Sequence, residues 1–485
     1  MSNYEFVITY EQDVKNINDW FDDKAIEFPI VHLNGEKINK KLWSYKPTAI
    51  IFSSVQNRPL PMILLLEARI RKITTITVEE SIQMALNDGR VNNYLFPVDY
   101  TAWGSEYEME ESLKLGLVNG ENRVTGWPFY HQEEKPQTVR AIKQELGLSE
   151  ESKVISLAFP GLFSGNETEV VRKKQLSIAS EIIRNDENIQ LLIKPHPVEK
   201  RDPLNQWIDE IFQNNRDRVF LIDGSVSIEK IIKVSDFMLN RGASQTFFEC
   251  LINKVPVIFL DVGQKCIFYK YAKDSVFTDV SDITKFINNY NASSFGVYYQ
   301  KLTQKFLPHN PTVALENVVH LIKQAIVKGP QEIPHFGEIM SFCLEYRLLN
   351  KAAKKSLKAF PSRKEFTQLY KKFNKRTSLS FNEWKVFLNE WKNTIYFQFI
   401  FSNFIRQIAN EKLIDKLPNE WVDYSMYFPS KVHAIWFYWA VEKTLYALSK
   451  TNTKNLKRYL QKNEFLKLEN EKFNQLLNQY EKIAY

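Results

Sequence analysis

Cysteine is scarce in this chain of 485 residues, which has only Cys250, Cys266 and Cys343. Three widely spaced cysteines form neither a zinc pattern nor a disulfide framework, and they are typical of a reducing cytoplasm. No apolar run approaches the 18 residues of a membrane-spanning helix. The N-terminus also has no basic segment followed by an apolar one, so no secretory signal is predicted. We therefore expect a cytoplasmic protein.

Several nucleotide and metal signatures are also absent. The sequence has neither the G-x-G-x-x-G dinucleotide fingerprint nor a G-x-x-x-x-G-K-[ST] phosphate loop. The seven histidines are scattered, and Asp22-Asp23 is the only adjacent pair of aspartates. We expect no metal site and no bound cofactor.

Charge is distributed unevenly along the chain. The net charge is +7, and residues 331–485 hold 26 Lys and Arg against 15 Asp and Glu. This segment also holds 30 of the 66 aromatic residues, most of them at helical spacing. We predict an all-helical domain over 331–485. Its basic character indicates an anionic partner, which can be a membrane surface, an acidic polymer or nucleic acid. No nucleic-acid-binding motif is present, so we expect no nucleic acid.

The first third of the chain has the pattern of parallel βαβ units. Short β-branched runs predict strands over 6–10, 49–54 and 73–78, with further strands near 94–98 and 123–130. A proline-led helix is expected between the second and third of these strands. This alternation predicts a Rossmann-like domain over 1–135.

A second α/β series begins at 153. Strands are expected at 153–161, 189–197, 218–224, 236–242 and 255–261, and helices at 171–185, 227–235, 245–253 and 310–328. The alternation predicts a doubly wound parallel sheet over 136–330, in which ligands bind at the carboxyl ends of the strands.

Two segments at such strand ends carry candidate binding residues. Lys194 and His196 lie in Lys-Pro-His-Pro directly after a strand, where two prolines hold the backbone extended and the imidazole can donate to a phosphate. The alternative is a structural histidine in a rigid turn. After another strand, Arg241-Gly242-Ala243-Ser244-Gln245-Thr246 leads into a helix.

In this second segment, Ser244 or Thr246 can cap the helix while its N-terminus faces an anion. The alternative is an ordinary cap with no ligand. Glu249 follows in the same helix and can accept hydrogen bonds from a ribose diol, or it can be a solvated acid. Gly161 and Ser164 lie in a glycine-bearing loop after the first strand of this half, and this loop can wrap a donor or an acceptor.

The order K-P-H-P, S-D-F-M-L-N-R-G-A-S-Q-T and K-V-P-V-I-F resembles the C-terminal half of GT-B glycosyltransferases of bacterial surface polysaccharides. The pattern is similar to CDP-glycerol glycerophosphotransferases and to sialyl- and Kdo-type transferases with an HP motif. The segments W-G-S-E-Y-E-M-E-E-S-L-K-L-G and N-R-V-T-G-W-P also resemble the N-terminal half of those enzymes. The resemblance covers about residues 45–330.

The resemblance implies two Rossmann-like domains facing a cleft, with the acceptor in the first and the nucleotide donor in the second. His196, Ser244 and Thr246 would bind the donor phosphate and Glu249 the ribose. Apart from the resemblance, we also expect Lys194, Arg241, Gln245, Gly161 and Ser164 to bind the donor, because they lie at or after the ends of predicted strands. Relatives carry Gln-His-Gly where this chain has Val78-Glu79-Glu80-Ser81. Glu79 or Glu80 would therefore replace the histidine base, or the pair is a plain acidic helix start.

The expected reaction is metal-independent, inverting transfer from a nucleotide-sugar to a hydroxyl of a glycan or lipid-linked acceptor, as in capsule or lipopolysaccharide synthesis. A cytidine donor of the CMP or CDP type is favoured. The basic C-terminal domain would bind the inner face of the cell membrane. The alternatives are a UDP-sugar transferase, a sugar-nucleotide epimerase and a non-catalytic nucleotide-sugar-binding assembly protein.

Overall fold

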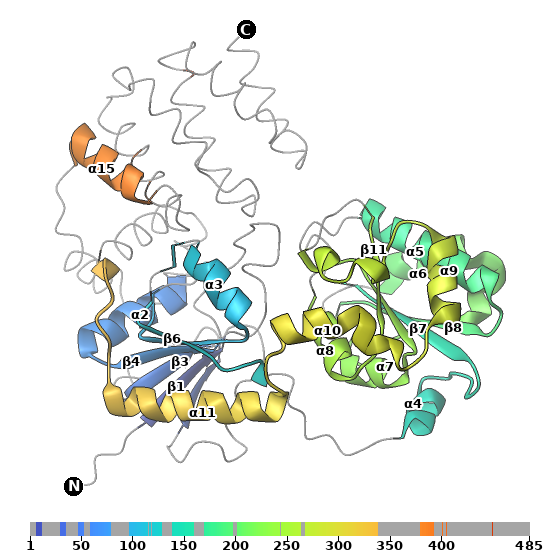
Figure 1. The fold of residues 1–485 in the computed structure, drawn as a ribbon, viewed down its shortest axis with the longest axis horizontal. Coiled ribbons are helices and arrows are strands. Elements are labelled where there is room, and N and C mark those ends of the chain that lie inside the picture. The colour runs from blue at the N-terminus through green and yellow to red at the C-terminus, as the bar shows by residue number, and fades with distance from the viewer. Residues whose placement is uncertain are drawn as a thin grey trace. The chain divides into compact units, whose positions relative to one another are not determined.

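The chain forms two compact units, one of residues 1–126 with 314–485 and the other of residues 127–313. In the computed structural model the described residues are 6–11, 30–34, 47–52, 59–78, 97–114, 116–117, 119–128, 138–159, 169–196, 201–242, 244–262, 267–337, 379–391, 400, 404 and 449. Each unit contains a six-stranded parallel sheet with helices in the connections (Figure 1). The predicted α/β class is therefore confirmed.

The sheet of the first unit has the strand order β2-β1-β3-β4-β5-β6. Strands β3 and β4 are almost wholly buried, which explains why both read as continuous runs of apolar and β-branched residues. The described elements are β1 (Phe6–Glu11), β2 (Ile30–Asn34), β3 (Pro47–Phe52), α2 (Pro59–Arg71), β4 (Thr74–Val78), β5 (Tyr100–Trp103), α3 (Glu106–Lys114), β6 (Glu121–Val124) and α15 (Phe381–Trp391).

The sheet of the second unit has the order β12-β11-β10-β7-β8-β9. Helices α5, α6 and α9 share one hydrophobic core with the strands, whereas α7 and α8 contact each other (Figure 1). The elements are α4 (Val139–Glu145), β7 (Lys153–Ala158), α5 (Glu169–Asn185), β8 (Ile189–Lys194), α6 (Arg201–Phe212), η3 (Gln213–Arg218), β9 (Val219–Leu221), α7 (Ile228–Val234), β10 (Phe237–Asn240), α8 (Gln245–Ile252), β11 (Val257–Leu260), η4 (Ile267–Lys270), η5 (Lys273–Ser275), β12 (Val276–Phe277), α9 (Val280–Asn289) and α10 (Ser294–Phe306).

Two elements lie elsewhere than the sequence predicted. The strand expected near 94–98 is β5, which begins at Tyr100. Helix α11 (Pro311–Lys328) was expected to close the second half, but its side chains bond to the first unit. Lys328 Nζ donates to Glu121 Oε2 at 2.8 Å, and Gln324 Oε1 accepts from Arg123 Nη1 at 2.7 Å. The domain limits 1–135, 136–330 and 331–485 remain predictions, and 331–485 lies mostly outside the described residues.

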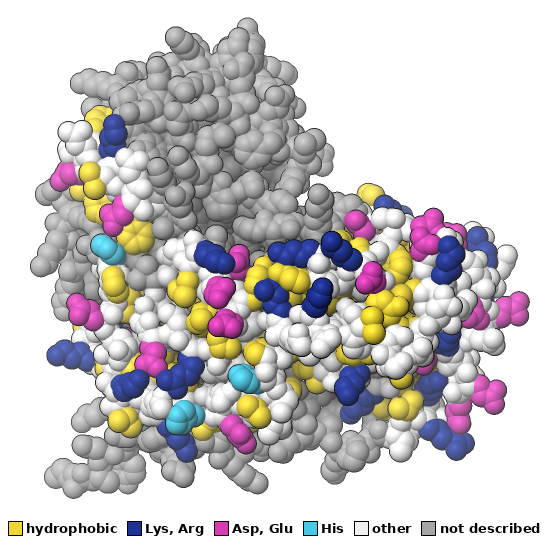
Figure 2. All heavy atoms as spheres, in the orientation of Figure 1, with side chains coloured by type: hydrophobic (Ala, Val, Ile, Leu, Met, Phe, Trp, Pro, Cys, Tyr) yellow, Lys and Arg dark blue, Asp and Glu magenta, His cyan; other side chains and the backbone are white. Residues whose placement is uncertain are grey.

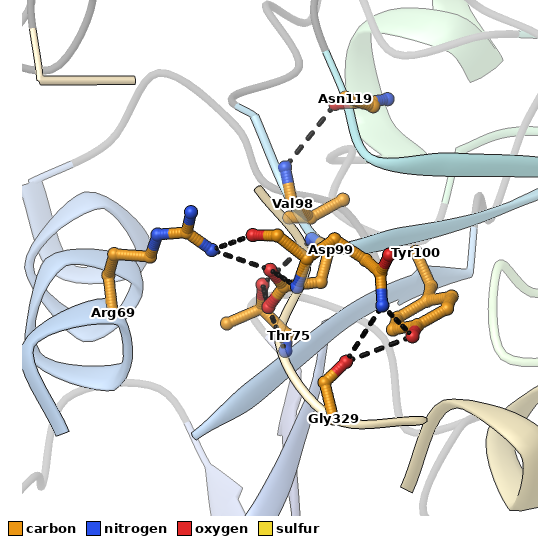
Figure 3. A network of polar contacts seen from close by, with 8 residues as sticks. Arg69, Thr75, Val98, Asp99, Tyr100, Asn119 and Gly329 are labelled. Carbon is orange, nitrogen blue, oxygen red and sulfur yellow. Dashed lines mark hydrogen bonds and ion pairs between the residues drawn. The ribbon is translucent and has the colours of Figure 1, made fainter. Parts of the chain in front are cut away.

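A buried carboxylate ties the segment after α11 to the first sheet (Figure 3). Asp99 Oδ2 accepts from the backbone and hydroxyl of Thr75 at 2.8 and 2.7 Å, and its Oδ1 accepts from Arg69 Nη1 and Gln331 N, both at 2.8 Å. The hydroxyl of Tyr100 donates to Gly329 O at 2.9 Å. Residues 329–331 are thereby fixed against β4, β5 and α2.

The visible surface of the described residues has mixed charge. Figure 2 shows Lys and Arg side chains interspersed with Asp and Glu side chains on this face. Within the described ranges, no helix is both long and apolar enough to cross a membrane.

Candidate functional site

The strand order of the second unit places a switch point at β7. The chain runs from β7 through β8 to β9 at one edge of the sheet, then returns to β10 on the other side of β7 and runs through β11 to β12 at the opposite edge. Right-handed crossovers then place α5 and α8 on opposite faces of the sheet. Ligands of doubly wound proteins bind at the carboxyl ends of the strands beside such a switch point. The segments that meet at this edge are those the sequence selected, after β8 and β10.

At the end of β8, Lys194 is buried and aligned with Ala158 of β7. Its Nζ donates to Gly224 O at 2.9 Å. Burial lowers the pKa of the Lys194 ammonium, an effect opposed by the negative charges of Asp223 and Glu249. A cation is therefore held at the strand end in a poorly solvated position, where it interacts strongly with any anion nearby.

His196 follows Lys194 after a single proline and is partly buried. Strand β8 ends at Lys194 although the sequence predicted it to continue to 197. Prolines at 195 and 197 supply no N–H to the neighbouring strand, which explains this early end. Contact of the imidazole with a phosphate remains a prediction.

At the end of β10, side-chain hydrogen bonds turn the backbone into α8. Asn240 Oδ1 accepts from Gly242 N at 2.8 Å, and the hydroxyl of Tyr269 donates to Arg241 O at 2.7 Å. Ser244 occupies the N-cap position in extended conformation, but its side chain makes no capping hydrogen bond. Ser244 therefore has the predicted N-cap position but does not make the predicted capping hydrogen bond. Its hydroxyl does not satisfy the first backbone N–H groups of α8.

Thr246 is partly buried in the first turn of α8. Buried phenylalanines pack this helix against η4. Phe247 packs 4.6 Å from Phe268 and 5.1 Å from Phe248, between ring centroids. Because these rings are wholly buried, the orientation of α8 is well determined.

Glu249 lies one turn into α8 and has an unusual environment. Its Oε2 is buried and has no hydrogen-bond partner. Burial raises the pKa of its carboxyl group to about 7, although the positive charge of Lys194 acts in the opposite direction. A buried carboxylate oxygen without a donor is costly. A ligand hydroxyl that supplies the missing donor would remove this cost.

Several predicted residues cannot be placed at the site. Glu79, Glu80, Gly161 and Ser164 lie outside the described residues, and so does the side chain of Gln245. Their roles remain predictions. Among the residues that the structure does describe, no three His, Cys, Asp or Glu side chains are grouped so that they could hold a metal ion.

Sequence reasoning missed two buried polar residues of α5. Arg172 and Gln175 face inward near the start of this helix, on the same side as Leu176, Ala179 and Ile183. The guanidinium carbon of Arg172 lies 4.5 Å from the centroid of the Phe159 ring, directly after β7. The spacing of 172, 175, 176, 179 and 183 is that of a buried helical face, and it could have identified both residues.

No protein-family model and no curated protein matches this sequence. Among solved structures, the chain is similar to Staphylococcus aureus MnaA in complex with UDP, with 12% identity and a TM-score of 0.48, covering 67% of this chain and 97% of that one.

The chain is also similar to a UDP-GlcNAc 2-epimerase from Neisseria meningitidis bound to UDP-GlcNAc, with 14% identity and a TM-score of 0.47, covering 66% of this chain and 99% of that one. A third similar structure is the wall teichoic acid polymerase TagF, with 14% identity and a TM-score of 0.43, covering 68% of this chain and 90% of that one. At these identities the similarities assign no activity to this chain.

Proposed function

We propose that this chain is a nucleotide-sugar-dependent glycosyltransferase of the GT-B type, and that its second unit binds the donor at the carboxyl edge of the sheet. The observation that carries this proposal is the buried, unpartnered Oε2 of Glu249 at the switch point, beside the cation Lys194. Together they offer an acceptor for hydroxyls and a positive charge for phosphate.

The carboxylate of Glu249 suits a ribose. A carboxylate is an acceptor with two oxygens, and the two vicinal hydroxyls of a ribose are donors that can reach both of them. Hydrogen bonds to a charged group contribute about 1.5–3 kcal/mol each when they replace an unsatisfied state. Glu249 therefore supports recognition of ribonucleotides over their deoxy forms.

The phosphate end of the donor is proposed to lie against Lys194, His196 and the start of α8 at Ser244 and Thr246. Helix N-termini favour anions because their N–H groups and dipole present positive charge. As the sugar is transferred, negative charge develops on the leaving phosphate, and fixed donors of this kind lower the barrier. Such groups would serve an inverting transfer that needs no metal ion.

The finer assignments rest on the sequence. We propose a cytidine-activated donor, a hydroxyl of a surface glycan or glycolipid as the acceptor, and Glu79 or Glu80 as the base that removes its proton. The alternative is a uridine-activated donor, and a nucleotide-binding experiment distinguishes it from a cytidine-activated one.

A thermal-shift screen of the full chain against CMP, CDP, UDP, GDP and their sugars tests donor binding. A ligand at 100 times its Kd stabilises the native state by about 2.7 kcal/mol, which is readily seen as a rise in Tm. Cytidine nucleotides are expected to give the largest rise. Absence of a shift with every nucleotide contradicts the proposal.

Turnover of the bound donor then separates the possible reactions. Incubation without acceptor should leave the nucleotide-sugar intact, while hydroxyl acceptors should release free nucleotide. Appearance of an epimerised nucleotide-sugar without any acceptor would instead identify an epimerase. Binding without turnover on any acceptor would identify a non-catalytic protein.

A further inference from the structure

One tyrosine hydroxyl bridges the ends of two neighbouring strands in the second sheet. Tyr269 lies in η4, the short helix that follows β11, and its hydroxyl donates to Arg241 O at 2.7 Å and to Leu260 O at 3.1 Å. Arg241 directly follows β10, and Leu260 is the last residue of β11. A hydroxyl has one proton, so this is a three-centre hydrogen bond in which Arg241 O is the nearer acceptor.

The two carbonyls lie where the pairing of β10 with β11 ends. The ladder aligns Asn240 with Phe259, so Arg241 is level with Leu260 one residue further along. Neighbouring strands are about 4.8 Å apart, so a hydroxyl between them can contact a carbonyl of each. Tyr269 therefore connects the two strands beyond their last paired residues, at the carboxyl edge where the donor is proposed to bind.

The ring that carries this hydroxyl is itself held by packing. Tyr269 is half-buried, and the centroid of its ring lies 5.7 Å from that of Phe259, a wholly buried residue of β11. A side chain that packing already fixes loses little further freedom when its hydroxyl donates. The hydrogen bond to the end of β10 is therefore preorganised by the neighbouring strand.

This hydrogen bond acts on the turn between β10 and α8. Asn240 Oδ1 accepts from Gly242 N at 2.8 Å, so side chains hold two consecutive residues of the turn. Ser244 follows at the N-cap and makes no capping hydrogen bond with its side chain. The position of the first backbone N–H groups of α8 therefore depends on the contacts that Tyr269 and Asn240 make with the turn.

The body of α8 is held by other contacts. Phe247 and Phe248 are buried, and their ring centroids lie 4.6 and 5.5 Å from that of Phe268 in η4. Glu249 follows these two residues in the helix, so ring packing fixes its place. Removing only the hydroxyl of Tyr269 leaves these ring contacts intact. The phosphate end of the site and its ribose end are thus positioned by different interactions.

We infer that Tyr269 is a positioning residue, which acts through the backbone of the turn to place the start of α8 for the donor phosphate. The inference rests on the proposed function, in which Ser244 and Thr246 contact that phosphate and Glu249 contacts the ribose. Tyr269 acts on the first of these contacts and not on the second. Because a displaced donor loses its advantage, loss of the hydroxyl should weaken phosphate binding selectively.

The experiment compares Tyr269→Phe with the wild-type full chain in calorimetric titrations with cytidine, uridine, CMP, CDP, UMP and UDP. The control is Tyr298→Phe, which makes the same chemical change on α10. The ring of Tyr298 stacks on Tyr290, which packs against Phe237 at the opposite end of β10. Tyr269→Phe should weaken the binding of all four nucleotides about 5- to 20-fold and that of both nucleosides less than about twofold. Tyr298→Phe should bind all six ligands as the wild type does.

The ratio of nucleotide affinity to nucleoside affinity separates positioning from a merely structural role, which would leave this ratio unchanged. Tyr269→Phe keeps its ring contacts, so its Tm should fall by at most a few degrees. Asn240→Ala removes the other hydrogen bond that holds the turn, and it should also weaken nucleotide binding selectively. This second variant decides the question if Tyr269→Phe does not fold, which circular dichroism will show.

Three results would overturn the inference and leave the proposed function standing. These are an equal loss for nucleosides and nucleotides, no loss for nucleotides, and the same selective loss in Tyr298→Phe. If the wild-type chain binds no nucleotide and no nucleoside, both the inference and the proposed function are overturned.

Discussion

Replacing Glu249 with glutamine should stabilise the protein at alkaline pH while weakening its binding of nucleosides. Burial raises the pKa of this carboxyl from 4.5 to about 7 in the folded chain. Between these two values the folded state keeps a proton that the unfolded state releases. The stability of the folded state therefore falls as the pH rises from about 4.5 to 7, and the full cost persists above that window.

The size of the stability change follows from the shift in the pKa of Glu249. At about 1.4 kcal/mol per pH unit, moving the pKa from 4.5 to about 7 costs about 3 kcal/mol once the carboxyl is ionised. Glutamine has nearly the same shape and carries no charge, so this pH dependence disappears in the variant. We expect similar stabilities near pH 5 and an advantage for Glu249→Gln of up to about 3 kcal/mol at pH 8.

Thermal melting from pH 5 to pH 8.5 measures this difference. For a domain of this size 1 kcal/mol moves Tm by about 2–4 °C, so a gain of several degrees should emerge with rising pH. Glu181→Gln, which changes an exposed glutamate on α5, serves as the control and should show no such trend. Nucleoside affinity should fall in Glu249→Gln although its Tm rises. The reasoning is refuted if Glu249→Gln has a lower Tm than the wild type at pH 8, or if the difference in Tm between the two does not change with pH.

Three further predictions concern other parts of the chain. His196→Ala should lower donor turnover by about 100-fold or more with little change in Tm, because one fixed donor to a leaving group contributes about 2.7–4 kcal/mol; unchanged turnover removes the imidazole from the mechanism. Asp99→Ala should destabilise the first unit by about 3–5 kcal/mol in urea unfolding, because it removes the buried carboxylate that accepts from Arg69, Thr75 and Gln331. Glu111→Ala, in an exposed ion pair, should change stability far less. The chain should co-sediment with anionic vesicles at low salt and dissociate at high salt, and a lack of binding at low salt excludes a membrane role for its basic C-terminal third.

The second sheet was largely predictable because its strands are buried on both faces. The runs at 153–158, 189–194 and 257–260 are mostly apolar or β-branched, and helices lie between the strands along the chain. A parallel sheet covered by helices requires such runs. The sequence also selected the ends of β8 and β10 because prolines and small residues follow them, and the structure places both at the carboxyl edge.

The first unit was harder to predict because its polar contacts join distant segments. Asp99 reads as part of a loop, yet it is wholly buried and immediately precedes β5. It is buried because Gln331, which is 232 residues away, donates to it together with Arg69 and Thr75. The same long-range contacts bring the segment after α11 to the first unit. Local patterns carry no information about partners at such separations.

Glu249 and Lys194 interact at the carboxyl edge of the second sheet. The ribose and phosphate ends of a donor should therefore shift the pKa of Glu249 in opposite directions. Ribose hydroxyls stabilise the carboxylate of Glu249 and lower its pKa, so nucleoside binding near pH 7 should release protons. A pyrophosphate ion bound at Lys194 adds negative charge beside Glu249 and raises the same pKa, so its binding should take protons up. Calorimetry in buffers with different ionisation enthalpies measures both signs. If nucleoside binding and pyrophosphate binding both release protons, or both take them up, then Glu249 and Lys194 do not bind the same donor molecule. A single donor that contacts both residues must lower the pKa of Glu249 through its ribose and raise it through its phosphates.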